Sequence, residues 1–317
     1  MNRDPFEALN LVAQRRLRGL FNPQPPPRPA ASGAPQVNSW TDLCFLRQSF
    51  APGSQPNWEL VYTTFAAVDE SDHLFFGHAP FKISDISFAQ ITASLEPVPD
   101  DHLYPIVPSV YEFTIAPRDL PLSAVYVKRN LGHYEDYLDR NLGRGAQAPA
   151  PAELPPRLLS EARILEVISR SESGPHPNIV EYLGVRINLS RITGLVMRRY
   201  EYNIYSYLQL GIGTMTMDEK DKFMEVLEDA VLRYLHEELG VAHNDINPFN
   251  VMVDVREGMV VPVLGGFGEA RKIGERIGEK IGGERGMLPG WTWRDEREEY
   301  MTSEVRHDVS ALGKEKL

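Results

Sequence analysis

The chain has 317 residues, which is long enough for two lobes, and 42% of them are hydrophobic, as in an ordinary globular protein. Its formal net charge is -11. This acidic balance disfavours nucleic acid and anionic membranes as partners, because both require a basic face. The one cysteine, Cys44, excludes an intramolecular disulfide and favours a cytoplasmic or nuclear location. No apolar run reaches the roughly 20 residues that a transmembrane helix needs.

The N-terminal third divides by composition. Residues 1–38 are Pro-rich around residues 25–27, which predicts a disordered or polyproline tail. Residues 39–100 form an N-terminal extension of unknown role. Within it, residues 58–65 and 74–76 are rich in aromatic and β-branched side chains, and they predict strands.

Two later segments each place a candidate functional charge in a predicted element. Residues 123–129 predict a strand that ends near Lys128. Residues 158–168 carry apolar side chains at helical spacing, which predicts an amphipathic helix with Glu161 near its start. Taken alone, both patterns are also typical of a lysine at an exposed strand end and of a solvated helix glutamate.

The middle of the chain continues the alternation of strands and helices. Residues 176–180 read His-Pro-Asn-Ile-Val, and residues 193–197 predict a strand that ends at Met197. Thr216 and Glu219 have the spacing of a capping box, which predicts that a long helix starts there and runs to about residue 238.

Residues 242–250 read Ala-His-Asn-Asp-Ile-Asn-Pro-Phe-Asn and follow this helix directly. Asp245 and Asn250 are five positions apart. Phosphoryl transfer needs a carboxylate to orient the attacking hydroxyl and an amide oxygen to hold a metal ion on the phosphates. The same residue types also favour turns, so the loop by itself leaves a purely structural role open.

Taken in order, these segments resemble the protein-kinase family, and the form of residues 243–250 is similar to a divergent group of fungal serine/threonine-type kinases. The resemblance implies an α+β, bilobal fold. Its β-rich N-lobe would span residues 101–198. A partial, helical C-lobe would span residues 199–317 and end in its central helix, where Asp308 would anchor the backbone of the catalytic loop.

The resemblance also assigns roles to the site residues. Lys128 and Glu161 would hold the phosphates of ATP, and Met197 would line the adenine pocket. Asp245 would orient the hydroxyl of a protein substrate, and Asn250 would bind Mg²⁺. The resemblance implies protein (Ser/Thr) phosphorylation, with a protein as substrate or partner, and it leaves the oligomeric state open.

Three departures from the family pattern count against phosphotransfer. The region before Lys128, residues 106–121, has no glycine with which to cover phosphates. Gly266 stands where the family has its metal-binding Asp, and the chain ends at Leu317. Three alternatives therefore stay open: a pseudokinase that acts as a binding module, a small-molecule kinase of the aminoglycoside or choline type, and the product of a truncated gene.

The segment after Gly266 also departs from a switchable kinase. Residues 271–286 are rich in glycine and charge, which predicts a mobile loop. Residues 269–291 contain no Ser, Thr or Tyr, and Asn244 takes the place of the Arg that would hold a phosphate. Switching by phosphorylation of this loop is therefore not expected.

Overall fold

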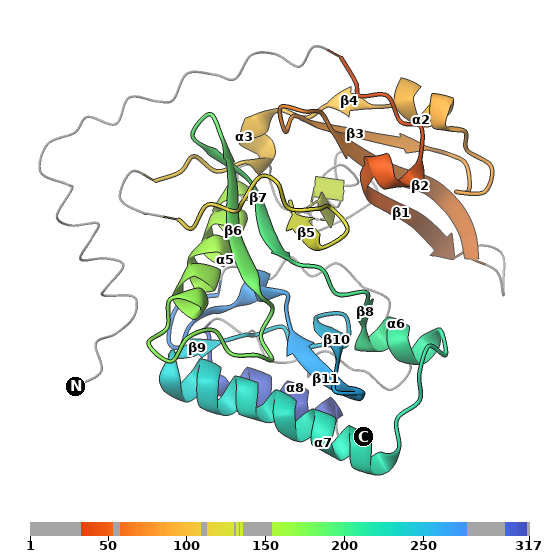
Figure 1. Cartoon of the computed structure of the whole chain (residues 1–317). Helices are drawn as coiled ribbons and strands as arrows, with labels where there is room; N and C mark the ends of the chain where they lie inside the picture. Colours follow the sequence, from red (N-terminus) through yellow and green to blue (C-terminus); the bar gives the residue numbers. More distant parts are fainter. Residues whose placement is uncertain are drawn as a thin grey trace, which may run out of the picture.

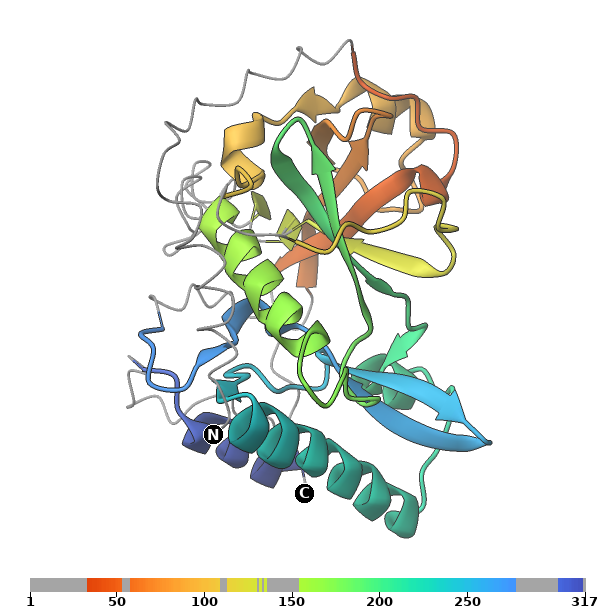
Figure 2. The same ribbon diagram turned by 60° about the vertical axis from the view of Figure 1, so that its left-hand side comes forward.

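The computed structural model describes residues 33–52, 58–108, 113–129, 131–132, 134–135, 154–277 and 302–315. Most of the predicted N-terminal tail and residues 278–286 of the predicted loop lie outside the described residues. Within the described ranges, no helix has the length and apolar character needed to span a membrane. Figures 1 and 2 show an upper part built on two sheets and a lower part that holds helix α7 (Met217–Glu228) and the hairpin of β10 (Val251–Arg256) and β11 (Met259–Leu264).

The N-terminal extension folds into an antiparallel sheet of four strands in the order β1-β2-β3-β4. Both predicted strands are confirmed. Their aromatic side chains form much of the small core beneath the sheet, where Phe65 and Phe75 are at most 1% exposed. The elements of this part are η1 (Trp40–Asp42), β1 (Leu43–Pro52), β2 (Trp58–Val68), β3 (Leu74–Ala79), α2 (Phe88–Ala93), β4 (Glu96–Pro97) and α3 (Asp100–Leu103).

A second antiparallel sheet has the order β5-β7-β6 and lies beside helix α5 in both views (Figures 1 and 2). Its strands are β5 (Val125–Lys128), β6 (Tyr182–Asn188) and β7 (Arg191–Arg198). The helix, α5 (Leu154–Ser169), buries the apolar face predicted from its spacing. Two prolines lie in its first turn, where the missing N–H groups have no intrahelical partner to lose.

The lower part begins after β7. Helix α7 starts at the predicted capping box, in which the Thr216 N–H donates to Glu219 Oε2 at 2.7 Å and the Glu219 N–H donates to Thr216 Oγ1 at 3.3 Å. The helix extends as far as predicted, but its last ten residues are π-helical. The elements are β8 (Tyr202–Asn203), α6 (Ile204–Gln209), α7 (Met217–Glu228), η3 (Asp229–Glu238), β9 (Val241–Ala242), β10 (Val251–Arg256), β11 (Met259–Leu264), η4 (Phe267–Glu269), β12 (Arg271–Lys272) and α8 (Val305–Glu315).

The main hydrophobic core joins the two parts. It contains Leu165 from α5 and Leu195 from β7, together with Leu235 from η3 and Leu264 from β11, and all four are fully buried. The strand-rich upper part therefore packs directly on the helical lower part. This mixed arrangement, with antiparallel sheets in the upper part, agrees with the predicted α+β, bilobal fold.

Candidate functional site

Lys128 and Glu161 are brought together across 33 positions of sequence. The Lys128 Nζ lies 2.8 Å from Glu161 Oε1, and Glu161 is only 1% exposed. Strand β5 holds Lys128 opposite Leu195 of β7, and α5 holds Glu161 on its buried side. The glutamate is therefore not a solvated helix residue. Removing one partner of such a buried pair typically costs about 3–5 kcal/mol, because it leaves an uncompensated charge.

The turn that contains Gly268 packs against this ion pair. A Cβ built on Gly268 would lie 3.7 Å from both Lys128 Nζ and Glu161 Oε2. Among the described residues, Glu161 Oε2 is buried and has no hydrogen-bond partner. The side chain of Lys128 is 23% exposed, so this edge of the ion pair is partly open to solvent.

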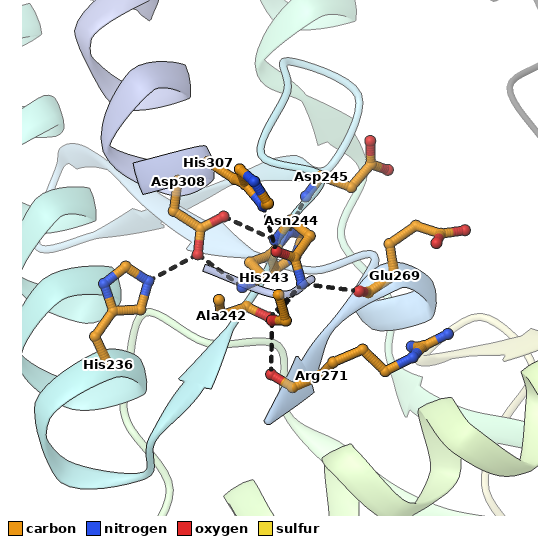
Figure 3. Close-up of polar contacts among 10 residues, drawn as sticks. His236, Ala242, His243, Asn244, Asp245, Glu269, Arg271, His307 and Asp308 are labelled. Atoms are coloured by element: carbon orange, nitrogen blue, oxygen red, sulfur yellow. Dashed lines mark hydrogen bonds and ion pairs between the residues drawn. The ribbon is translucent and has the colours of Figure 1, made fainter. Parts of the chain in front are cut away.

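Residues 243–245 are anchored from α8. Asp308 accepts hydrogen bonds from the backbone N–H groups of His243 and Asn244, each at 2.7 Å, as expected from the sequence. A third bond at 2.7 Å joins Asp308 to His236 Nε2. The His243 Nε2–H donates to the carbonyl of Gly265 at 2.8 Å. This bond connects the loop to residues 265–268, the glycine-rich turn. Figure 3 shows Asp308 with His236 and with the loop residues His243 and Asn244.

Asp245 and Asn250 lie side by side. The Asn250 Nδ2 group donates to Asp245 Oδ2 at 2.9 Å and to the Asp245 carbonyl at 2.8 Å. Asn247 closes the turn between them: its Oδ1 accepts from the N–H groups of Phe249 and Asn250, and its Nδ2 donates to the Asp245 carbonyl. The loop thus presents a carboxylate beside an amide. This is the geometry that the sequence motif predicts, and it leaves the catalytic roles of both residues as predictions.

The residues of the glycine-rich turn do not fit a magnesium ion held as in the kinase family. Gly266 offers no side-chain oxygen, and a Cβ placed on it would lie 2.3 Å from Asn250 Cγ and Oδ1. The Asn250 amide therefore occupies the space that an Asp side chain at position 266 would need. Across the described ranges, no cluster of three or more His, Cys, Asp or Glu residues is placed to hold a metal ion.

Glu269 is the nearest carboxylate along the chain to the missing Asp. Its Oε1 accepts from Arg157 Nη1 of α5 at 2.9 Å, and both side chains are 15% exposed. This ion pair holds Glu269 toward α5. Sequence reasoning missed the pair because 112 positions separate the two residues and neither belongs to a recognisable motif.

Met197 lies in β7 and is 5% exposed. It belongs to the main core and is paired in register with Tyr126 of β5 and Tyr182 of β6. The structure thus places it at the end of the same sheet that carries Lys128. Its role as a pocket residue stays a prediction.

A second cluster, which sequence reasoning also missed, surrounds the side chain of Asn244. Its amide contacts backbone or side-chain atoms of Ala242, Glu269, Ser303 and His307 (Figure 3). The one available signal was the asparagine itself, because it takes the place of an Arg in the resembling family.

No protein-family model matches the chain. Over 118 residues it is 30% identical to the MAP kinase kinase kinase SSK2 of Saccharomyces cerevisiae, and this stretch makes up 37% of the chain but only 7% of that protein. A solved structure of the yeast RNA Pol II CTD kinase CTDK-1 complex matches 38% of this chain and 36% of its own, with a TM-score of 0.31 and 18% identity. The sequence similarity and the arrangement of the described elements support a protein-kinase-like fold.

Proposed function

We propose that this chain is a protein-kinase-like module that binds a nucleotide through Lys128 without a bound magnesium ion, and that it transfers phosphate poorly or not at all. The observation that carries the proposal is the Lys128–Glu161 ion pair beside the Gly268 turn. An oriented lysine is a suitable partner for nucleotide phosphates because its charge offsets theirs.

Electrostatics is the reason why we propose poor or absent phosphotransfer. Phosphoryl transfer depends on cations that stabilise charge in the transition state, and removing one oriented contact of this kind costs about 3–4 kcal/mol. Here Gly266 supplies no ligand, and Glu269 is engaged by Arg157. In this proposal Asp245 would still orient an acceptor hydroxyl, but neither Gly266 nor Glu269 supplies a metal ligand to stabilise the transferred group.

We propose that the physiological partner is a protein. The net charge of -11 opposes binding to nucleic acid, whose phosphates would be repelled. The similarity to a MAP kinase kinase kinase favours a protein over a small molecule as the partner. The pseudokinase and the weak Ser/Thr kinase then differ only in residual activity, which one assay separates.

The test is a thermal-shift titration with ATP, once with excess Mg²⁺ and once with EDTA. A ligand that binds only the native state at a hundredfold excess over its Kd stabilises the protein by about 2.7 kcal/mol. We expect the same rise in Tm under both conditions. We also expect it to vanish in Lys128→Met combined with Glu161→Gln, where the second change avoids leaving a buried unpaired charge.

Lys222→Met is the matched control, because this lysine lies on the exposed face of α7 and pairs with Asp218 one turn away. It should leave the nucleotide shift unchanged. A shift that requires Mg²⁺ would overturn the metal-free site, and no shift under either condition would refute nucleotide binding. Robust incorporation of labelled phosphate into a protein substrate, lost in Asp245→Asn, would contradict the proposal of poor or absent phosphotransfer.

A further inference from the structure

The two ends of the segment between Glu269 and Ser303 are held together by backbone pairing. Strand β12 pairs with β9, which places Arg271 opposite Ala242. Downstream, the Gly274 N–H donates to the Ser303 carbonyl and the Ser303 N–H donates to the Glu275 carbonyl, each at 2.8 Å. The outgoing and returning strands thus form a stem beside residues 242–245.

One side chain, that of Asn244, ties this stem to the loop that carries Asp245. The Asn244 Nδ2 group lies 3.1 Å from the carbonyls of both Ala242 and Glu269, and 3.0 Å from Ser303 Oγ. Its Oδ1 accepts from His307 Nδ1 at 3.0 Å. Because a carbonyl can only accept a hydrogen bond, the two carbonyls fix which way the amide faces.

The backbone of Asn244 is suited to this position. Its φ is +60°, a left-handed conformation that asparagine adopts more readily than most residues. It is only 7% exposed, and Ser303 is fully buried. The amide contacts both ends of the stem and α8 in one buried site. Figure 3 shows Asn244 with Glu269 and His307.

A neutral amide differs in kind from an arginine. Kinase loops that are ordered by phosphorylation gain Arg–phosphate ion pairs, and these exist only after modification. Asn244 carries no charge to pair with a phosphate, and its contacts are made to groups that are always present. Residues 269–291 offer no hydroxyl to modify.

We propose that Asn244 is a positioning residue that latches residues 269–276 and 302–307 onto the catalytic loop through contacts to unmodified groups. The latch acts through the stem and through Asp308, which holds the Asn244 backbone N–H. It does not depend on nucleotide binding, so it stands or falls separately from the proposed function.

The test is hydrogen exchange of the full chain, measured by mass spectrometry, in the wild type and in Asn244→Gly. Glycine keeps the left-handed backbone without strain and removes only the side chain. We expect exchange in residues 270–277 and 302–307 to rise by about tenfold or more, since several buried hydrogen bonds are lost. Exchange in the β10–β11 hairpin should not change.

Asn247→Ala is the matched control, because Asn247 is also a buried asparagine of this loop and, among the described residues, its side chain bonds within the loop to Asp245, Phe249 and Asn250. Its effect should stay within residues 245–250. If Asn244→Gly does not fold, Ser303→Ala removes the contacts of Ser303 Oγ with Asn244 Nδ2 at 3.0 Å and with the Arg271 carbonyl at 3.4 Å. It should raise exchange in residues 270–277 and 302–307 by less than Asn244→Gly does. No local rise, or an equal rise throughout the chain, would overturn the latch.

Discussion

Two neighbouring glycines show how one side chain determines what position 266 tolerates. Gly266 has φ +77°, and a Cβ there would overlap the Asn250 amide at 2.3 Å. At Gly265 the nearest atoms to such a Cβ are 3.7 Å away, which is ordinary contact. The second glycine of the pair therefore does two things: it adopts a left-handed backbone, and it leaves room for the asparagine that bonds to Asp245.

We expect Gly266→Ala to lower the free energy of unfolding by about 2–3 kcal/mol, from left-handed strain and a displaced Asn250 hydrogen bond. Gly265→Ala, one residue away, should change it by less than about 0.5 kcal/mol. Urea unfolding of the three proteins measures both values. Equal stability of the two variants would contradict the packing of Asn250 against Gly266.

At the scale of elements, the loop after α5 is tied to η3 through His176. Its Nε2 lies 3.3 Å from Asp229 Oδ2, and its Nδ1 accepts from the Asn178 N–H at 3.1 Å. Burial lowers the pKa of His176 below its ordinary value, although Asp229 opposes this shift. The folded chain therefore holds this histidine neutral, in agreement with an Nδ1 that accepts a hydrogen bond.

Because the pKa of His176 is lower in the folded chain, the unfolded chain binds its proton more tightly. The contribution of His176 to stability is then full above about pH 6.5 and is lost as the pH falls through the folded pKa. Urea unfolding between pH 8 and pH 5 should show a smaller acid-side loss in His176→Asn than in the wild type. His78→Asn, at an exposed site on β3, serves as the control and should follow the wild-type pH profile. Identical pH profiles for His176→Asn and the wild type would refute the coupling.

The start of the segment after η4 forms a strand where the local sequence pattern predicts a mobile loop. Residues 271–286 predict a mobile loop because glycine and charge alternate without an apolar face. The structure instead pairs Arg271 and Lys272 with β9. That pairing is decided by the chain some 30 positions earlier, so no strand signal is present in the segment itself.

At the scale of the whole molecule, the N-terminal sheet is fastened to the part that carries Lys128. Glu135 is 2% exposed and accepts from Thr64 Oγ1 of β2 and, at 3.0 Å, from Arg47 Nη1 of β1. Asp72, between β2 and β3, pairs at 3.3 Å with Arg129, the residue after Lys128. The predicted boundary near residue 100 is thus crossed by buried polar contacts.

We expect Glu135→Ala to lower the free energy of unfolding by about 2–3 kcal/mol, because Thr64 is left buried without its acceptor. Calorimetry should still show one transition at a lower Tm, since the sheet and the rest of the chain unfold together. Glu59→Ala, at an exposed position of β2, is the control. Two separate transitions in Glu135→Ala would show instead that the extension is an independent domain.

Local patterns determined the elements and their order. The aromatic and β-branched side chains of β2, the helical spacing of α5 and the capping box at Thr216 are all local features, so the sequence alone reveals them. The spacing of Asp245 and Asn250 is equally local, and it places the two side chains together through one short turn.

Tertiary structure decided which groups the site can use. Glu161 is buried against Lys128 because α5 packs beside the β5–β7 sheet. Glu269 is engaged by Arg157, and the Asn244 amide is fixed by residues as far as 63 positions away. Such partners are chosen by the packing of distant elements in three dimensions, and packing leaves no periodic trace in the sequence from which the pairing can be read.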